Sequence, residues 1–155
     1  MGNRAVITLD KKPTENSVGI YLHWNGGAES VLAFAEAGKR FGIRYGDESY
    51  ATARLAQIIG NFFGGTLSVG VDVLKRLDCH NHDNGTFKVF TDEKGEIALE
   101  QSPDGKTGWR RLDIDQIKRH QYWQKTEESE GILADIIKAN HPAYKVMEPN
   151  KPTEA

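Results

Sequence analysis

Residues 20–27 read IYLHWNGG, a strand-like run that leads straight into a turn. Bulky and β-branched residues from Val18 to Trp24 favour an extended backbone. Asn25, Gly26 and Gly27 offer the positive φ angles that a sharp strand-to-helix turn needs. Apolar residues recur at helical spacing from residue 28 onward. The stretch therefore predicts a strand, a tight turn and a helix in direct succession.

Further elements follow on both sides of this stretch. Alternating or β-branched runs predict strands at residues 4–9, 18–24, 66–71, 87–90, 96–100 and 109–114. Helical periodicity predicts one helix from residue 28 to a stop at Gly42 and another from a cap at Ser49 to a stop at Gly64. Residues 115–124 and 129–140 are also predicted to be helical, and residues 73–77 to form a helical turn.

The order of these elements indicates a single α+β domain over residues 1–147. We expect a mostly antiparallel sheet of about five strands, with the two N-terminal helices packed on one face and a C-terminal helical segment. Residues 148–155 contain two prolines and few apolar groups, so we expect a disordered tail there.

Composition restricts the classes of partner. The chain has 155 residues, 38% of them hydrophobic, and its 20 basic and 22 acidic side chains leave a net charge of −2. This balance disfavours both a strongly basic nucleic-acid binder and a strongly acidic DNA mimic. Cys79 is the only cysteine, which suits a reducing compartment. No apolar run reaches the roughly 20 residues of a membrane span and no signal peptide is recognisable, so we expect a cytoplasmic protein without a membrane partner.

Two groups of residues are candidates for ligand binding. His23, Asn25, Gly26 and Gly27 combine a base with a turn whose backbone N–H groups suit a nucleotide or an oxyanion. The structural alternative places Trp24 in the core and leaves the glycines only a turn-forming role. The second group consists of Arg54, Gln57 and Asn61, which share one stripe of a predicted helix. They either bind a ligand together or are simply the solvent-exposed face of an amphipathic helix.

Metal binding is the hypothesis for the polar segment 78–83. His80 and His82 form a His-x-His pair that directs two imidazoles to one side of an extended chain. No distant motif supplies the remaining ligands, and a solvated loop has the same composition. We therefore predict no cofactor, with His80 and His82 as the metal candidates.

Aromatic and basic residues alternate in two C-terminal segments, WRR at 109–111 and KRHQYWQK at 118–125. Such a composition suits either nucleic acid or a protein interface, and neighbouring acidic residues favour protein. Trp24, Phe34, Phe62 and Phe63 are expected in the core. The aromatic and arginine residues left as partner-binding anchors are Trp109, Arg111, Tyr122 and Trp123.

Several segments of the N-terminal half carry a resemblance as a set: NRAVIT at 3–8, IYLHWNGG at 20–27, ARL at 53–55, QIIG at 57–60 and FFGGTLS at 62–68. Together they resemble a family of small proteins encoded by bacteriophages, prophages and plasmids. The resemblance continues to the turn at 83–85, and the C-terminal third departs from it. It implies a mobile-element origin, in which small accessory proteins often inhibit host machinery, as anti-CRISPR and other anti-defence proteins do. It brings no established activity with it.

We therefore expect a non-catalytic protein that binds and inhibits or modulates a host protein complex, such as a CRISPR-Cas defence system. The alternative is a protein that binds a small nucleotide signal or nucleic acid, and a metal-dependent enzyme ranks third. The oligomeric state is open, with a homodimer as one option.

Overall fold

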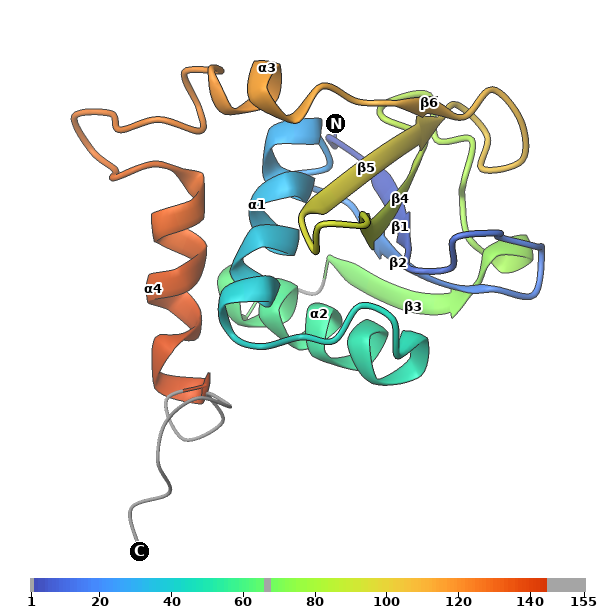
Figure 1. The fold of residues 1–155 in the computed structure, drawn as a ribbon, viewed down its shortest axis with the longest axis horizontal. Coiled ribbons are helices and arrows are strands. Elements are labelled where there is room, and N and C mark those ends of the chain that lie inside the picture. The colour runs from blue at the N-terminus through green and yellow to red at the C-terminus, as the bar shows by residue number, and fades with distance from the viewer. Residues whose placement is uncertain (1, 66–67, 145–155) are drawn as a thin grey trace, which may run out of the picture.

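In the computed structural model, which describes residues 2–65 and 68–144, strands and helices are interleaved along the chain (Figure 1). The strands are β1 (Ala5–Thr8), β2 (Val18–Leu22), β3 (Val69–Val73), β4 (Thr86–Thr91), β5 (Ile97–Ser102) and β6 (Arg110–Arg111). The helices are α1 (Ala28–Arg40), α2 (Glu48–Phe63), the 3₁₀ helix η1 (Leu74–Arg76), α3 (Ile114–Lys118) and α4 (Ile132–Tyr144). The predicted α+β class is confirmed.

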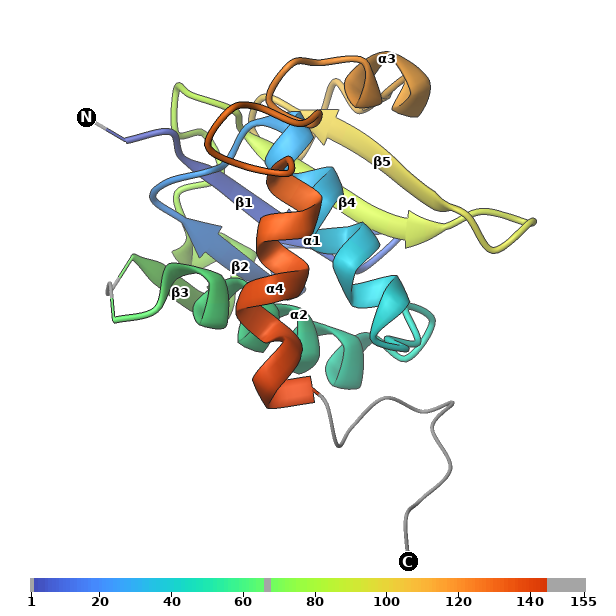
Figure 2. The same ribbon diagram turned by 90° about the vertical axis from the view of Figure 1, so that its left-hand side faces the viewer.

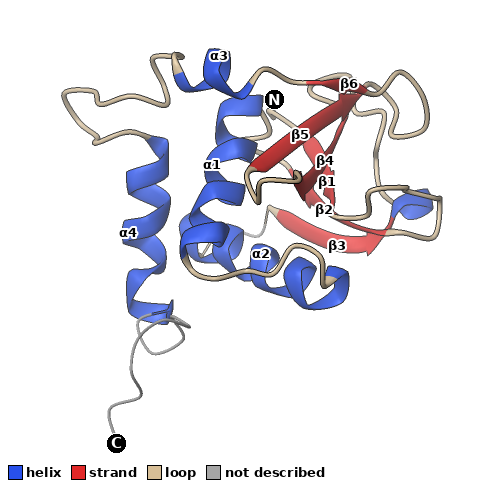
Figure 3. Cartoon of the chain, viewed as in Figure 1, coloured by secondary structure: helices blue, strands red, loops and turns tan. Residues whose placement is uncertain are grey.

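The sheet has six strands within the described ranges, in the order β3-β2-β1-β4-β5-β6 (Figure 3). The sheet was predicted to be mostly antiparallel with about five strands, and it is instead a mixed sheet, because β1 and β4 run parallel, with Val6 opposite Thr86. After β3 the chain passes through η1 and the following loop before it enters β4 in the direction of β1. The strands β1 and β2 pair antiparallel, as do β4 and β5, which agrees with the mostly antiparallel sheet that was predicted.

Helices α1 and α2 lie against one face of the sheet, and α4 packs on both helices from the outside (Figure 2). The C-terminal helix therefore forms a third layer, outside α1 and α2. The largest fully buried side chains are Phe34, Phe87, Ile7, Ile20, Leu22, Leu32, Leu55, Ile58, Ile59, Leu99 and Ile132. They come from the sheet, α1, α2 and α4, and each stabilises the fold by about 1.5–3 kcal/mol.

Loops and η1 cover the opposite face of the sheet, called here the second face. Val6, with no exposed surface, and Gly19 lie on this face under Leu74. A Cβ atom at Gly19 would come within 2.6 Å of the Leu74 side chain, so glycine is needed for this close approach. The chain from η1 to β4 is thus packed onto the sheet.

The C-terminal elements are shorter than predicted. The helix predicted for 115–124 ends at Lys118, after an N-terminal cap in which the Asp113 carboxylate accepts a hydrogen bond from the Gln116 N–H. The strand predicted for 109–114 is reduced to the two residues of β6. Gly131 has a φ of 100°, which keeps it outside α4 and moves the start of the last helix to Ile132. The predicted tail at 148–155 lies outside the described residues.

One predicted core residue lies at the surface. Trp24 is 45% exposed, whereas Phe34 is buried and Phe62 and Phe63 are partly buried around it. Trp24 follows the end of β2, so its side chain is no longer held against the helix layer. None of the helices in the described ranges is long and apolar enough to cross a membrane.

Candidate functional site

Tyr21, His23 and Trp24 contact one another in turn at the end of β2, and Tyr122 contacts Asn25 in the turn that follows. We call these four side chains the aromatic surface. Trp24 and Tyr122 are 45% and 42% exposed, which is unusual for such large side chains. The His23 ring meets the Trp24 ring edge-on, with centroids 5.1 Å apart. Tyr21 Oη lies 2.9 Å from His23 Nδ1. These contacts restrain Trp24 and His23 without burying Trp24.

The strand and turn fix this arrangement through the backbone. Tyr21 and His23 are two residues apart and therefore point to the same side of the chain. The Asn3 N–H donates to the His23 carbonyl over 2.9 Å, and the Gly26 N–H donates to the Asn3 carbonyl over 2.8 Å. A Cβ at Gly26 would lie 2.5 Å from the Asn3 oxygen, so this glycine allows the close approach of two segments.

The predicted turn at Asn25, Gly26 and Gly27 forms, and one N–H group of the predicted cradle is already used within the fold. The left-handed residue of the turn is Asn25, with a φ of 58°, and neither glycine has a positive φ. The Gly26 N–H is already used by Asn3, and the Gly27 carbonyl accepts the Val31 N–H at the start of α1. The Gly26 N–H is therefore occupied within the fold, and ligand binding by Gly27 stays a prediction.

Asn25 joins two regions that the sequence treated as separate candidates. Its side-chain amide donates to Tyr122 Oη over 3.1 Å and also lies 3.4 Å from Ser30 Oγ. Tyr122 belongs to the connection between α3 and α4, and its carbonyl accepts the Ile132 N–H. The structure thus brings His23 and Asn25, predicted to bind a ligand, together with Tyr122, predicted to bind a partner.

An ion pair near this surface was not identified from the sequence. The Arg4 guanidinium donates to Asp83 Oδ2 over 2.8 Å, and the Arg4 N–H reaches the same oxygen over 3.0 Å. These hydrogen bonds hold the pKa of the Asp83 carboxyl below its ordinary value. Burial raises the pKa of Tyr21, so its phenol remains neutral beside His23 at neutral pH.

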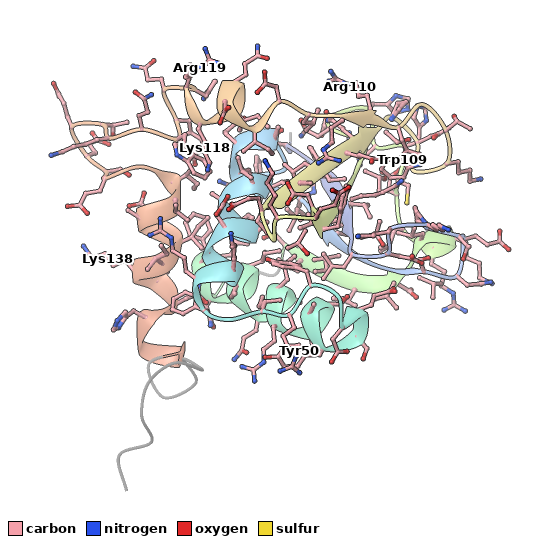
Figure 4. The ribbon with its side chains drawn as sticks, viewed as in Figure 1. Tyr50, Trp109, Arg110, Lys118, Arg119 and Lys138 are labelled. Atoms are coloured by element: carbon pink, nitrogen blue, oxygen red, sulfur yellow. The ribbon has the colours of Figure 1, made fainter. Side chains whose placement is uncertain are left out.

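Arg54 and Gln57 lie on α2 and do not complete a site with His23. Since α2 begins just after α1 ends, its first turns lie at the far end of α1 from Asn25. The Arg54 guanidinium stacks 5.1 Å from the Tyr50 ring, near the lower edge in Figure 4. The third member of the predicted stripe, Asn61, donates to Asn140 of α4 and thus belongs to a helix interface.

Trp109 and Arg111 lie apart from Tyr122, on the second face of the sheet. Lys88 Nζ lies 4.4 Å from the centre of the Trp109 ring and also 3.2 Å from a Glu100 carboxylate oxygen. Arg111 stacks over Phe90 at 5.1 Å. Figure 4 places Trp109 on the opposite side of the molecule from Lys118 of α3. The four predicted anchors therefore do not form one continuous group.

Trp123 packs against the hydrophobic core and is only partly exposed. Its backbone carbonyl lies so close to Gly131 that a Cβ there would be 2.3 Å from the oxygen. Leu133 and Ile137 line a surface hollow of about 500 Å³ beside it. The tryptophan thus supports the connection into α4, and its role in binding a partner stays a prediction.

Asn81 organises the segment that contains His80 and His82, a role that was not predicted from the sequence. Asn81 is fully buried, and its Oδ1 accepts the N–H groups of Asp83, Asn84 and Gly85 over 3.0–3.2 Å. Its amide donates to the carbonyls of Asp78 and Gly85, each over 3.0 Å. An asparagine amid turn-forming residues is the local signal for such a loop.

The two imidazoles have ring centroids 4.4 Å apart. Within residues 2–65 and 68–144, no three or more His, Cys, Asp or Glu side chains are grouped to hold a metal ion. Burial raises the pKa of the neighbouring Cys79 thiol, which works against a reactive thiolate.

Comparisons of this chain with protein-family models, with curated proteins and with solved structures find no match. Fold alone does not determine function. Function therefore has to be inferred from the side chains and their geometry.

Proposed function

We propose that this chain is an accessory protein of phage or plasmid type that binds a host protein complex and inhibits or modulates it in the bacterial cytoplasm. A bacterial defence system such as CRISPR-Cas is the partner that the resemblance of the N-terminal half favours. The exposed pair Trp24 and Tyr122 carries the proposal, because tryptophan and tyrosine dominate the energetics of protein interfaces.

The restraints on these two side chains support this proposal. Tyr122 is held by the Asn25 amide, and Trp24 rests edge-on against His23. A side chain that is ordered before binding loses less conformational entropy when a partner covers it. Surface aromatics of this kind are expected to contribute about 2 kcal/mol or more each when they are buried at an interface.

A nucleic-acid or nucleotide ligand is the second candidate, favoured by the basic and aromatic groups of the second face. Lys88 lies over Trp109, while Arg111 and Lys11 both lie over Phe90. The Lys88–Glu100 ion pair and the net charge of −2 reduce its attraction for phosphates. This candidate is distinguishable by salt, since phosphate-dominated binding weakens steeply as the salt concentration rises.

Affinity capture from a lysate of the bacterial host tests the first candidate. The wild-type chain should retain a stoichiometric protein partner at moderate salt, and a Trp24→Ala, Tyr122→Ala double variant should lose it. Tyr50→Ala is the matched control, because Tyr50 is a part-exposed aromatic residue at the other end of α1. Equal retention by the double variant, or equal loss with the control, contradicts the proposal.

A second assay connects binding with inhibition of defence. Expression of the chain should raise the plating efficiency of phage on bacteria that carry an active defence system, and the double variant should not. Thermal unfolding of both proteins confirms that the variant is folded. Capture of an oligonucleotide that is released between low and moderate salt, with no protein partner, favours the second candidate.

A further inference from the structure

A small cavity lies where β4 begins and β5 ends, lined by residues other than those of the aromatic surface. Its volume is about 350 Å³, within the lower range of small-molecule sites. The side chains that give it chemical character are His80, His82, Asp83, Gln101 and Arg110. None of them belongs to the aromatic surface, so the cavity calls for a separate explanation.

The loop that carries the two histidines is preorganised. Buried Asn81 uses its amide for five hydrogen bonds to the surrounding backbone. His80 and His82, on either side of it, both line the cavity, with ring centroids 4.4 Å apart. Each imidazole offers at least one N–H donor whether it is neutral or charged. Two donors are thereby placed in one wall.

Arg110 of β6 adds a cation to the same lining. Arg110 is exposed, and its Nη2 donates to Gln101 Oε1 over 3.3 Å. Gln101 in turn donates through Nε2 to the Asn84 carbonyl over 2.8 Å, which fixes its amide against the histidine loop. This chain of hydrogen bonds directs the Arg110 guanidinium toward the loop and leaves its other N–H groups for a ligand.

The charges of the lining favour an anion. Asp83 supplies the one carboxylate of the described lining, and this carboxylate is paired over 2.8 Å with Arg4, which also lies 3.7 Å from Asp78. Within the described ranges no carboxylate forms an ion pair with Arg110. The cavity therefore combines one uncompensated guanidinium with two imidazoles. Guanidinium groups bind phosphate oxygens in a bidentate manner, and imidazole N–H groups suit the remaining oxygens.

We propose that this cavity binds the phosphate group of a small phosphomonoester, with Arg110, His80 and His82 as its recognition residues. The volume exceeds that needed for phosphate alone, which leaves room for a small organic group. Among the described residues no third His, Cys, Asp or Glu joins the two imidazoles, so we assign the pair a role as hydrogen-bond donors.

Titration of the ¹⁵N-labelled full chain with inorganic phosphate and with ribose 5-phosphate, at constant ionic strength, tests this assignment. Amide signals of residues 80–85 and of Arg110 should shift saturably, and ribose 5-phosphate should bind more tightly than phosphate. Arg110→Ala should weaken binding about tenfold, the equivalent of one lost charge-assisted contact. His80→Ala with His82→Ala should weaken it further, and Asn81 remains in place to hold the loop.

Arg111→Ala is the matched control, because the neighbouring arginine points to the other face and lies over Phe90. It removes the same charge and should change the affinity less than twofold. Equal weakening by both arginine variants means non-specific attraction and overturns the proposal. So does an absence of shifts at residues 80–85, while equal affinity for both probes overturns the phosphomonoester assignment. The spectrum of each variant itself reports whether the fold is retained.

Discussion

The side-chain amide of Asn25 donates a hydrogen bond to the Tyr122 hydroxyl, 3.1 Å away, across 97 residues of chain. It fastens the α3–α4 connection to the turn that starts α1. Asn25 is therefore both a turn residue and a clamp on an exposed aromatic group. The turn requires a positive φ of the Asn25 backbone, whereas the contact with Tyr122 requires the side-chain amide.

Substitutions at Asn25 separate these roles. Its φ of 58° is accessible to glycine and strained for a β-branched residue. We expect Asn25→Val to lower the free energy of unfolding by about 2 kcal/mol, and Asn25→Gly by less than about 1 kcal/mol. Denaturant titration measures both values. If the two variants are equally stable, backbone strain at this position is not significant.

Trp24 and Phe34 should respond very differently to truncation. Phe34 is fully buried, so Phe34→Ala should cost about 3–5 kcal/mol. Trp24 is 45% exposed, and Trp24→Ala should lower the free energy of unfolding by less than about 1 kcal/mol. Thermal and denaturant unfolding of both variants check this ordering. A large loss of unfolding free energy in Trp24→Ala would show that Trp24 contributes to the core.

Asn81 should be the least replaceable residue of the histidine loop. Its removal leaves several buried backbone groups without partners, so Asn81→Ala should cost at least about 2 kcal/mol. The exposed Asn16 is a matched control, and Asn16→Ala should change stability by less than about 0.5 kcal/mol. Equal stability of the two variants, measured by urea unfolding, contradicts this role for Asn81.

At low pH the Asp104 carboxylate should lose its contribution to the free energy of unfolding. The N–H groups of Thr107 and Lys106 lower the pKa of its carboxyl to about 2. The unfolded value is about 3.9, so the charge stabilises the fold above pH 4, and this contribution is lost as the pH falls toward 2. The stability difference between wild type and Asp104→Asn should thus be constant above about pH 4.5 and shrink below it. Urea unfolding from pH 2 to pH 7 measures it, and a difference that grows on acidification has the wrong sign.

Local periodicity was sufficient to predict most elements of the fold. The strands around Ile7 and Ile20 and the helices α1 and α2 have side-chain patterns that can be recognised within about ten residues. The parallel pairing of Val6 with Thr86 has no such local signal, because it depends on where the chain goes after η1. The exposure of Trp24 was also missed, since hydrophobicity alone places tryptophan inside.

The same distinction applies to the candidate site. His80, His82, Asn25 and Tyr122 were recognised by residue type, but the contacts that they make were not. Arg110 reaches the histidine loop through Gln101, and Asn25 reaches Tyr122 across most of the chain. Contacts between residues far apart in sequence follow from the fold, which residue spacing does not reveal.

Because β1 lies in the middle of the sheet, it cannot be fully paired while the chain is still being synthesised. Residues 5–8 are all buried, yet one of their two neighbouring strands, β4, starts only at residue 86. While a ribosome makes the N-terminal half, β1 can pair with β2 alone, and its other edge presents unsatisfied peptide groups. Release of the nascent chain before residue 91 should therefore yield an aggregation-prone fragment that needs a chaperone. Completion of the sheet waits for the second half of the protein to emerge.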